Sequence, residues 1–450
     1  MSDSTGAPDL VIRGGLVLPM VSGGDFFRGD VAIRDGRITA VTENVRDDCS
    51  ATRVLDASNA AVLPGFIQGH VHVVQSLLRH QADGLELLDW LRLRTWPYEA
   101  ALDGDGVEAA AELGIVELLS GGTTTALDFG TTHDHDRVFR AAEKLGIRFV
   151  SGKTHMDVGA GAPAALFEDP ERSLSDAAVL GKRWHGAADG RLRYAVAPRF
   201  ALSCSPGLLR GCADLARAHG WLIQTHAAEN REEVEEVRAL SGLGNIEFLD
   251  SHGLVGEDVI LAHGIYLDEA DVRRLAETRT TICHCPGANL KLGSGIADVP
   301  GLLQAGVPVV LGADGPPCNN RLSIFHEMSL AATIHGLRHG PAALDPWAVL
   351  GMATRDAAAA LHLEDEIGTL ENGKAGDVVV VELGEWSTLP GGDPASRIVF
   401  GGGPQMVRHV VVSGQPLVVD GKLKGVDTDA LRECIAEAWK ATRRRMEEIQ

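Results

Sequence analysis

Apolar and polar positions alternate over short stretches at both ends of the chain. Residues 9–63 contain short β-branched runs such as LVIRGGLVL and DVAIRDGRITAV, separated by Gly, Asp and Asn. The same pattern returns after residue 370 in GDVVVVEL and RHVVVSGQPLVV. Such runs are typical of strands joined by turns. We therefore predict a small β-sandwich domain built from residues 1–62 and 366–426, followed by an amphipathic helix within residues 427–450.

Residues 63–365 show a different pattern, in which β-branched apolar segments alternate with Ala- and Leu-rich segments of helical period. This alternation predicts parallel strands joined by right-handed helical crossovers. Eight candidate strands can be counted: AVLPGFIQGHVH, TTTALDFG, IRFVSGKTHMD, RLRYAVAPRF, WLIQTHAAE, VILAHGIYL, TTICHCP and PVVLGADG. Eight such units and ~250 residues suit a closed barrel. The predicted fold is thus α/β, a TIM-like (β/α)8 barrel with the small β-domain attached.

Charge narrows the choice of partners. The chain carries 41 Lys plus Arg against 62 Asp plus Glu, a formal net charge of -21, which repels phosphate backbones and anionic membranes. No apolar run approaches the ~18–20 residues of a membrane span. The N-terminal MSDSTGAPDL also lacks the basic-then-apolar order of a secretion signal. We expect a cytoplasmic protein that acts on a small molecule, with no nucleic-acid or membrane partner.

The seven cysteines are interpreted as free thiols. Their number is odd and no secretion signal accompanies them, which argues against a disulfide framework. The segment CHCP places Cys283 and Cys285 two apart but lacks the second cysteine pair of a structural zinc site. Both are therefore expected in a buried strand.

Ionisable side chains collect at the predicted carboxyl ends of the strands, which is where barrel enzymes place their active sites. Side chains two apart in a strand face the same side, so one cation can contact both histidines of HVH. A single buried histidine is more often a satisfied core residue, and only the joint pattern favours a shared metal site. The residues at these strand ends are His70, His72, His226, Glu229, His263 and Asp314.

Other polar residues near strand ends receive a structural interpretation. His133 and His135 repeat the H-x-H spacing in the charged segment TTHDHD, which favours a solvated turn. Lys153 ends the third strand, where a basic side chain is more often an ion-pair partner than a ligand.

The segments PGFIQGHVH, THAAEN, LAHG and LGADG, in this order, resemble the amidohydrolase superfamily and its metal-dependent aminohydrolase branch. The resemblance covers nearly the whole chain. HVHVVQ, RFVSGKTHMD, APRFALSCS and HCPGANLKLGSG are similar to guanine deaminases. GADGPPCNNRLSIFHEM instead looks like relatives that act on adenosine thioethers or chlorinated triazines.

This resemblance implies one Zn²⁺ per chain, with Fe²⁺ as a possible substitute. Such an ion lowers the pKa of a bound water toward ~7, so that hydroxide is available near neutrality. Glu229 would then carry a proton to the substrate, while His263 and Asp314 orient the attacking water. The implied ligands are His70, His72, His226 and Asp314.

The resemblance also implies hydrolytic deamination of an amino-substituted N-heterocycle, with guanine to xanthine plus ammonia as the first choice. Arg199 would donate to guanine O6 or N7, and Gln75 would contact the base. Trp90 and Trp96 are expected to supply apolar walls. For Arg199 the alternative is a purely structural pairing with a carboxylate such as Asp157.

Alternative functions stay open at this point. They include deamination or dechlorination of an adenosine thioether, 8-oxoguanine, isoguanine or an s-triazine. A non-catalytic binding protein on the same fold is less favoured, because the metal set and Glu229 are intact. The resemblance further implies a homodimer.

Overall fold

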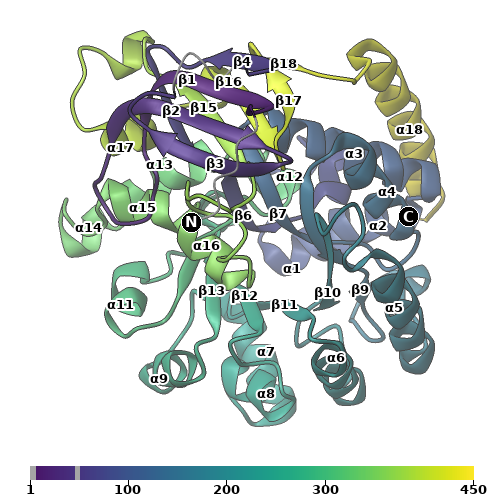
Figure 1. Cartoon of the computed structure of the whole chain (residues 1–450). Coiled ribbons are helices and arrows are strands. Elements are labelled where there is room, and N and C mark those ends of the chain that lie inside the picture. The colour runs from purple at the N-terminus through teal and green to yellow at the C-terminus, as the bar shows by residue number, and fades with distance from the viewer. Residues whose placement is uncertain (1–6, 46–50, 450) are drawn as a thin grey trace.

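The barrel is the larger part of the molecule in the computed structural model, which describes residues 7–45 and 51–449. Within these residues eight parallel strands, neighbours in the order of the chain, form a nearly closed barrel (Figure 1). The predicted TIM-like α/β fold is confirmed. The strands are β6 (Phe66–Val71), β7 (Thr123–Phe129), β8 (Arg148–Gly152), β10 (Leu192–Pro198), β11 (Leu222–Ala227), β12 (Val259–His263), β13 (Thr281–His284) and β14 (Val309–Leu311), with the short β9 (Thr154–His155) beside β10.

The barrel closes at its carboxyl rim, where the first and last strands meet. The backbone N–H of Asp314 donates to the carbonyl of His70 over 3.1 Å. Asp314 and Val71 also form an isolated parallel bridge there. Gly312 permits this approach, because a Cβ at that position would lie 2.5 Å from the carbonyl oxygen of His70. Closure therefore brings two candidate ligands from opposite ends of the barrel sequence into contact.

Helices surround the barrel strands (Figure 1). Their ends carry the expected capping residues; for α6, Ser205 accepts a hydrogen bond from Leu208 N–H at the start and Gly220 is left-handed at the end. The helices that follow successive strands are α3 (Gly104–Ser120), α4 (Asp136–Leu145), α5 (Pro170–Trp184), α6 (Pro206–His219), α7 (Arg231–Ser241), α8 (Asn245–Ser251), α9 (Glu269–Thr278), α10 (Pro286–Lys291), α11 (Val299–Gln304), α12 (Pro316–Asn319), α13 (Ile324–Ile334), α14 (Gly336–His339), α15 (Pro346–Met352) and α16 (Arg355–Ala360).

Both chain ends contribute to one further, mostly antiparallel sheet, which lies above the barrel in Figure 1. Residues from the two ends of the chain, such as Ile12 and Val380, share one buried cluster on this single sheet. The strands are β1 (Leu10–Val17), β2 (Phe27–Arg34), β3 (Arg37–Thr42), β4 (Arg53–Asp56), β5 (Ala60–Pro64), β15 (Val378–Glu382), β16 (Val407–Val412), β17 (Gln415–Val419) and β18 (Lys422–Leu423), with α17 (Pro394–Gly401) inserted after β15.

The predicted first barrel strand is in fact two strands. β5 belongs to the small sheet and pairs with β15, whereas β6 belongs to the barrel, and only Gly65 separates them. The apolar run is continuous because both halves are buried, so sequence pattern alone did not mark the break. The division of the chain into domains at residues 62, 365 and 426 stays a prediction, and residue 62 falls inside β5.

A buried ion pair joins the barrel to the small sheet. Arg148 of β8 donates to Asp377, which precedes β15, over 2.9 and 3.2 Å. The side chains are only 3% and 2% exposed, and Asp377 also accepts from Ser413 N–H at 2.7 Å. The carboxylate of Asp377 thus accepts three hydrogen bonds at a site that is buried away from solvent.

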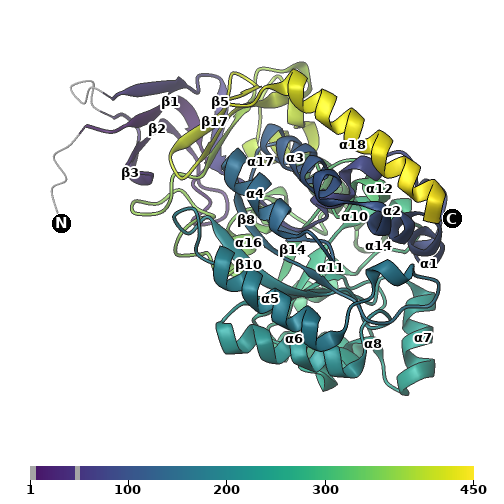
Figure 2. The ribbon, with the colours of Figure 1, turned by 90° about the vertical axis from the view of Figure 1, so that its right-hand side faces the viewer.

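The helix expected near the C-terminus is α18 (Thr428–Ile449), which runs along the outside of α3 and toward α2 (Trp96–Ala101) in Figure 2. Arg445 secures it by donating to the carbonyl of Ala101 over 2.6 Å and by an ion pair of 2.8 Å with Asp103.

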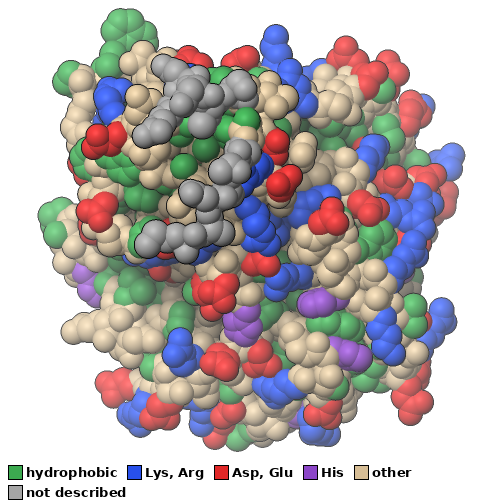
Figure 3. Space-filling view, viewed as in Figure 1, with side chains coloured by type: hydrophobic (Ala, Val, Ile, Leu, Met, Phe, Trp, Pro, Cys, Tyr) green, Lys and Arg blue, Asp and Glu red, His purple; other side chains and the backbone are tan. Residues whose placement is uncertain are grey.

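The described residues include most of the surface and six of the seven cysteines. In the described residues no helix has the length and apolarity needed to cross a membrane. On the described part of the face in Figure 3, acidic and basic side chains are interspersed and no continuous basic surface is seen. All six cysteines of the described ranges are free, while Cys49 and residues 1–6 lie outside those ranges.

Candidate active site

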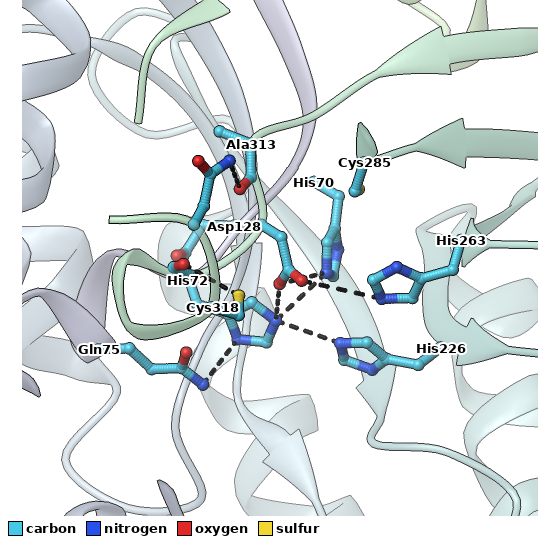
Figure 4. A network of polar contacts seen from close by, with 12 residues as sticks. His70, His72, Gln75, Asp128, His226, His263, Cys285, Ala313 and Cys318 are labelled. Carbon is cyan, nitrogen blue, oxygen red and sulfur yellow. Dashed lines mark hydrogen bonds and ion pairs between the residues drawn. The ribbon is translucent and has the colours of Figure 1, made fainter. Parts of the chain in front are cut away.

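Three imidazoles and a carboxylate converge at the carboxyl rim of the barrel. His70, at the end of β6, and His72, just after it, point toward His226 of β11 (Figure 4). Nε2 of His72 lies 3.2 Å from Nε2 of His70 and 3.1 Å from Nε2 of His226. Oδ1 of Asp314 lies 3.5 and 3.3 Å from the Nε2 atoms of His70 and His72. The structure thus brings together the four residues that the sequence suggested as ligands.

This arrangement fits a tetrahedral zinc ion. All four ligand atoms lie within 4.8 Å of one another. Zn–N bonds of 2.0–2.1 Å at tetrahedral angles separate two ligand nitrogens by about 3.3 Å, close to the spacings observed. Three neutral imidazoles and one carboxylate also match the nitrogen and oxygen donors that zinc accepts. The cluster therefore suits a metal ion both by its geometry and by its donor atoms.

The surroundings of His226 and His72 favour the neutral imidazole, which is the form that binds a metal. Nδ1 of His226 donates to the backbone carbonyl of Arg199 over 2.7 Å, which leaves the lone pair of Nε2 facing the other ligands. Burial, followed by the neighbouring imidazoles, holds the pKa of His226 well below its ordinary value. Burial and His70 do the same to the pKa of His72.

Glu229 lies beside the metal cluster, two residues after the end of β11. Its side chain is 3% exposed, and its Oε2 lies 3.3 Å from Nε2 of His263. Burial raises the pKa of Glu229 well above its usual value, and the nearby carboxylates of Asp314 and Glu233 raise it further. A carboxyl group with a raised pKa in a cavity is suited to receive and return a proton.

The loop that carries Glu229 is held by a second carboxylate. Oε2 of Glu233 accepts from the backbone N–H groups of Glu229 and Asn230 over 2.8 and 3.3 Å. Asn230 in turn caps α7, so Glu233 completes a capping box at the helix start. The sequence ENREE carries that signal, but the analysis of the sequence did not assign Glu233 a place in the site.

A buried hydrogen-bonded triad lies directly beside the metal cluster, and Nε2 of its Gln75 is 3.4 Å from Nδ1 of His72 (Figure 4). Arg199 donates to both carboxylate oxygens of Glu99 over 2.5 and 3.2 Å, and Nε2 of Gln75 donates to Glu99 over 3.0 Å. The structural partner suggested for Arg199, Asp157, is wrong: Asp157 accepts from Ser205 N–H instead. Glu99 comes from α2, and no local pattern marks it in the sequence.

Apolar side chains complete the cavity wall. Trp90 lies in the wall as predicted, but Trp96 does not and instead packs in the buried cluster behind it. Trp90 ends one short α-helix and Trp96 begins the next, with the π-helical segment Leu91–Thr95 between them, so regular α-helical spacing does not describe how the two rings are oriented. The apolar members of the wall are Leu87, Trp90, Leu91, Phe200 and Leu292.

The remaining candidates lie outside the cavity. Lys153 is an ion-pair partner as expected, bound to Glu168. His135 was wrongly expected in a solvated turn: it is 2% exposed and its Nε2 lies 3.1 Å from the hydroxyl of Ser151. Cys283 and Cys285 are buried and neither belongs to the metal cluster; Cys283 lies in β13 as predicted, whereas Cys285 follows that strand and precedes α10.

Comparisons with known proteins agree with this geometry. The amidohydrolase family matches residues 61–417. A 5-methylthioadenosine/S-adenosylhomocysteine deaminase of Syntrophobacter fumaroxidans is 36% identical over 429 residues, which cover 94% of this chain and 96% of that protein.

Solved structures similar to this chain also include deaminases. An adenosine deaminase from Xanthomonas campestris with bound zinc has a TM-score of 0.91 and 30% identity, covering 97% of this chain and 99% of the other. The guanine deaminase of E. coli is more distant, with a TM-score of 0.82, 28% identity, and coverage of 91% and 99%. The chain belongs to the amidohydrolase family, as a hydrolase of its aminohydrolase branch, which acts on the carbon–nitrogen bonds of cyclic amidines.

Proposed function

We propose that this protein is a zinc-dependent deaminase of an adenine-type nucleoside, in the class of 5-methylthioadenosine and S-adenosylhomocysteine. The observation that carries the proposal is near full-length similarity to a deaminase named for these thioethers, in a chain that keeps the complete metal cluster and Glu229. The apolar wall around Trp90 suits the uncharged methylthio group of 5-methylthioadenosine.

The chemistry would use water as the nucleophile and release ammonia. Zinc, when bound, supplies hydroxide near neutrality. Glu229 would receive a proton from the water and pass it to the ring nitrogen beside the amino-bearing carbon, and would then carry a second proton, from the newly added hydroxyl, to the departing amine. Nε2 of His263 and Oδ2 of Asp314, 3.9 Å apart, face the same point and orient the attacking oxygen. The amino group leaves as ammonia and a carbonyl replaces it.

Guanine is the second candidate, and Arg199 is the observation that favours it. A guanidinium can donate to the O6 and N7 acceptors of guanine. In this chain, however, Glu99 accepts from both terminal nitrogens of Arg199, so the side chain is already engaged. A panel assay of ammonia release separates the two candidates directly. We expect the highest kcat/KM for an adenosine thioether, and a higher value for guanine would contradict the proposal.

The metal content gives an independent prediction. We expect about one equivalent of zinc per chain after dialysis, because the described residues offer one ligand group of three histidines and Asp314. Elemental analysis measures it, with His226→Ala as the variant expected to lose the ion. Two equivalents retained by active enzyme would contradict a mononuclear site, and iron in place of zinc would correct the choice of metal.

Substrate ranking in Arg199→Ala gives a further prediction. Because Arg199 braces Glu99 and, through it, Gln75, we expect kcat/KM to fall by similar factors for guanine and for an adenosine thioether. The ratio of the two values does not depend on the folded fraction, so it is insensitive to lost stability. A selective loss for guanine of roughly 5- to 150-fold, the effect of ~1–3 kcal/mol, would instead identify Arg199 as a guanine-binding residue.

A further inference from the structure

The segment between β13 and α11 contacts both members of the Glu229–His263 pair. From it, Asn289 contacts His263 and Ser294 contacts Glu229. We propose that Asn289 and Ser294 are positioning residues, a clamp that holds the imidazole and the carboxylate in one productive arrangement. This inference rests on the hydrolytic role proposed above for Glu229, and it does not depend on which heterocycle is the substrate.

Asn289 determines which nitrogen of His263 carries the proton. Nδ1 of His263 lies 2.8 Å from Oδ1 of Asn289, and both side chains are essentially inaccessible to solvent. An amide oxygen can only accept, so Nδ1 must donate and Nε2 of the neutral ring keeps its lone pair. That lone pair faces Glu229, and Nε2 is buried without a hydrogen-bond partner among the described residues. Such an atom is available to the reacting water.

Ser294 distinguishes the two oxygens of Glu229. Its hydroxyl donates to Oε1 over 3.3 Å, while Oε2 stays 3.3 Å from His263. One oxygen is therefore held by the protein and the other faces the reaction. The same hydrogen bond lowers the pKa of Glu229, opposing the larger upward effects of burial, Asp314 and Glu233. Ser294 thus favours the ionised carboxylate, which is the form that accepts a proton.

The two contacts belong to one rigid unit. The backbone N–H of Ser294 donates to the carbonyl of Asn289 over 2.9 Å, and Tyr266 donates its phenol to the carbonyl of Ser294 over 2.7 Å. Gly293 and Gly295 flank the serine at φ values of 68° and 141°, which only glycine adopts without strain. This turn sets the serine hydroxyl against Glu229 and leaves it no exposure to solvent.

The competing explanation is that both side chains only satisfy buried polar groups. Under that explanation their removal lowers stability, while the kcat of the folded, zinc-loaded enzyme and its pH dependence stay unchanged. A positioning role predicts the opposite, because the reacting groups lose their orientation while the fold persists. Kinetics at controlled zinc content therefore separates the two.

The first experiment is Ser294→Ala in the full chain, assayed on whichever substrate of the panel the wild type turns over best. We expect kcat to fall by roughly 10- to 100-fold, the effect of losing a hydrogen bond to a charged group, with a smaller change in KM. Loss of the donor raises the pKa of Glu229, so the acidic limb of kcat/KM moves to higher pH. The groups that face Glu229, namely Asp314, Glu233 and His263, are unchanged in this variant.

Two variants serve as controls. Ser294→Thr keeps the hydroxyl and should recover part of the lost kcat. Thr354→Val removes another fully buried hydroxyl, which donates to the carbonyl of Leu350 far from the rim, and should leave kcat unchanged. Wild-type kcat and pH profile in folded, zinc-loaded Ser294→Ala would overturn the role of Ser294. A loss of stability alone would do the same.

The second experiment needs no turnover. In zinc-loaded protein labelled with ¹⁵N-histidine, we expect His263 to carry its proton on Nδ1, with the resonance identified by its absence in His263→Gln. Asn289→Leu should lose this signature, whereas Asn289→Asp keeps an acceptor and should preserve it. A wild-type His263 protonated on Nε2 would overturn the role of Asn289. If no substrate of the panel reacts, the proposed function fails. The protonation of His263 seen by ¹⁵N spectroscopy would still test the role of Asn289.

Discussion

Glu229→Gln is expected to lower kcat by ~10²- to 10⁴-fold while leaving the zinc content unchanged, the range that a positioned proton carrier contributes. The amide preserves the shape of the side chain and can still accept from Ser294, but it cannot accept and return a proton. Because the four metal ligands are other residues, the ion should remain bound. Steady-state kinetics and elemental analysis of the same preparation measure both quantities.

Glu112→Gln is the matched control for this substitution. Glu112 is also a largely buried glutamate, but it lies on α3 and pairs with Lys144, away from the metal cluster. We expect its kcat to stay at the wild-type value. A near-native rate in zinc-loaded Glu229→Gln would remove Glu229 from the mechanism, whatever the substrate.

Arg148→Met is expected to lower the free energy of unfolding by about 3–5 kcal/mol, the usual effect of leaving one partner of a buried ion pair uncompensated. The substitution keeps an apolar stem of similar length but leaves the carboxylate of Asp377 buried with fewer donors. Since this pair joins the barrel to the small sheet, the loss affects the contact between them. Denaturant unfolding measures the change.

Two further variants test the reason for this effect. Arg148→Met combined with Asp377→Asn removes the buried charge while an amide oxygen can still accept from Ser413, so we expect most of the loss to be recovered. Arg443→Met breaks an exposed pair with Glu447, whose side chains are 68% and 65% exposed, and should cost about 0–1 kcal/mol. An Arg148→Met cost no larger than this would contradict the proposed importance of the buried pair.

Two simple rules predicted that the candidate ligands lie together, whereas their assignment as ligands came from the family resemblance. Strand periodicity places His70 and His72 on one face, and parallel strands bring their carboxyl ends, with His226 and Asp314, to one rim. Both rules depend only on local pattern and on the handedness of the crossover connections. The structure then adds the closure between His70 and Asp314, which no local pattern encodes.

Residues that act through tertiary contacts could not be predicted in this way. Glu99 lies in a helix far along the chain from Arg199, and only the folded barrel brings the two together. The preference for guanine relied on Arg199 as a free guanidinium, and its engagement by Glu99 removes much of that argument. The prediction for His135 was wrong for a related reason. Its charged local sequence gives no sign of the buried contact that it makes with Ser151 in the fold.

The pairing of β5 with β15 has a consequence for how the chain is made on the ribosome. β5 ends at Pro64 and β15 begins at Val378, so about 310 residues must be synthesised before the two can pair. At ~5–20 residues per second this takes roughly 15–60 s. During that interval the newly made N-terminal strands expose an apolar edge that nothing in the nascent chain can yet cover.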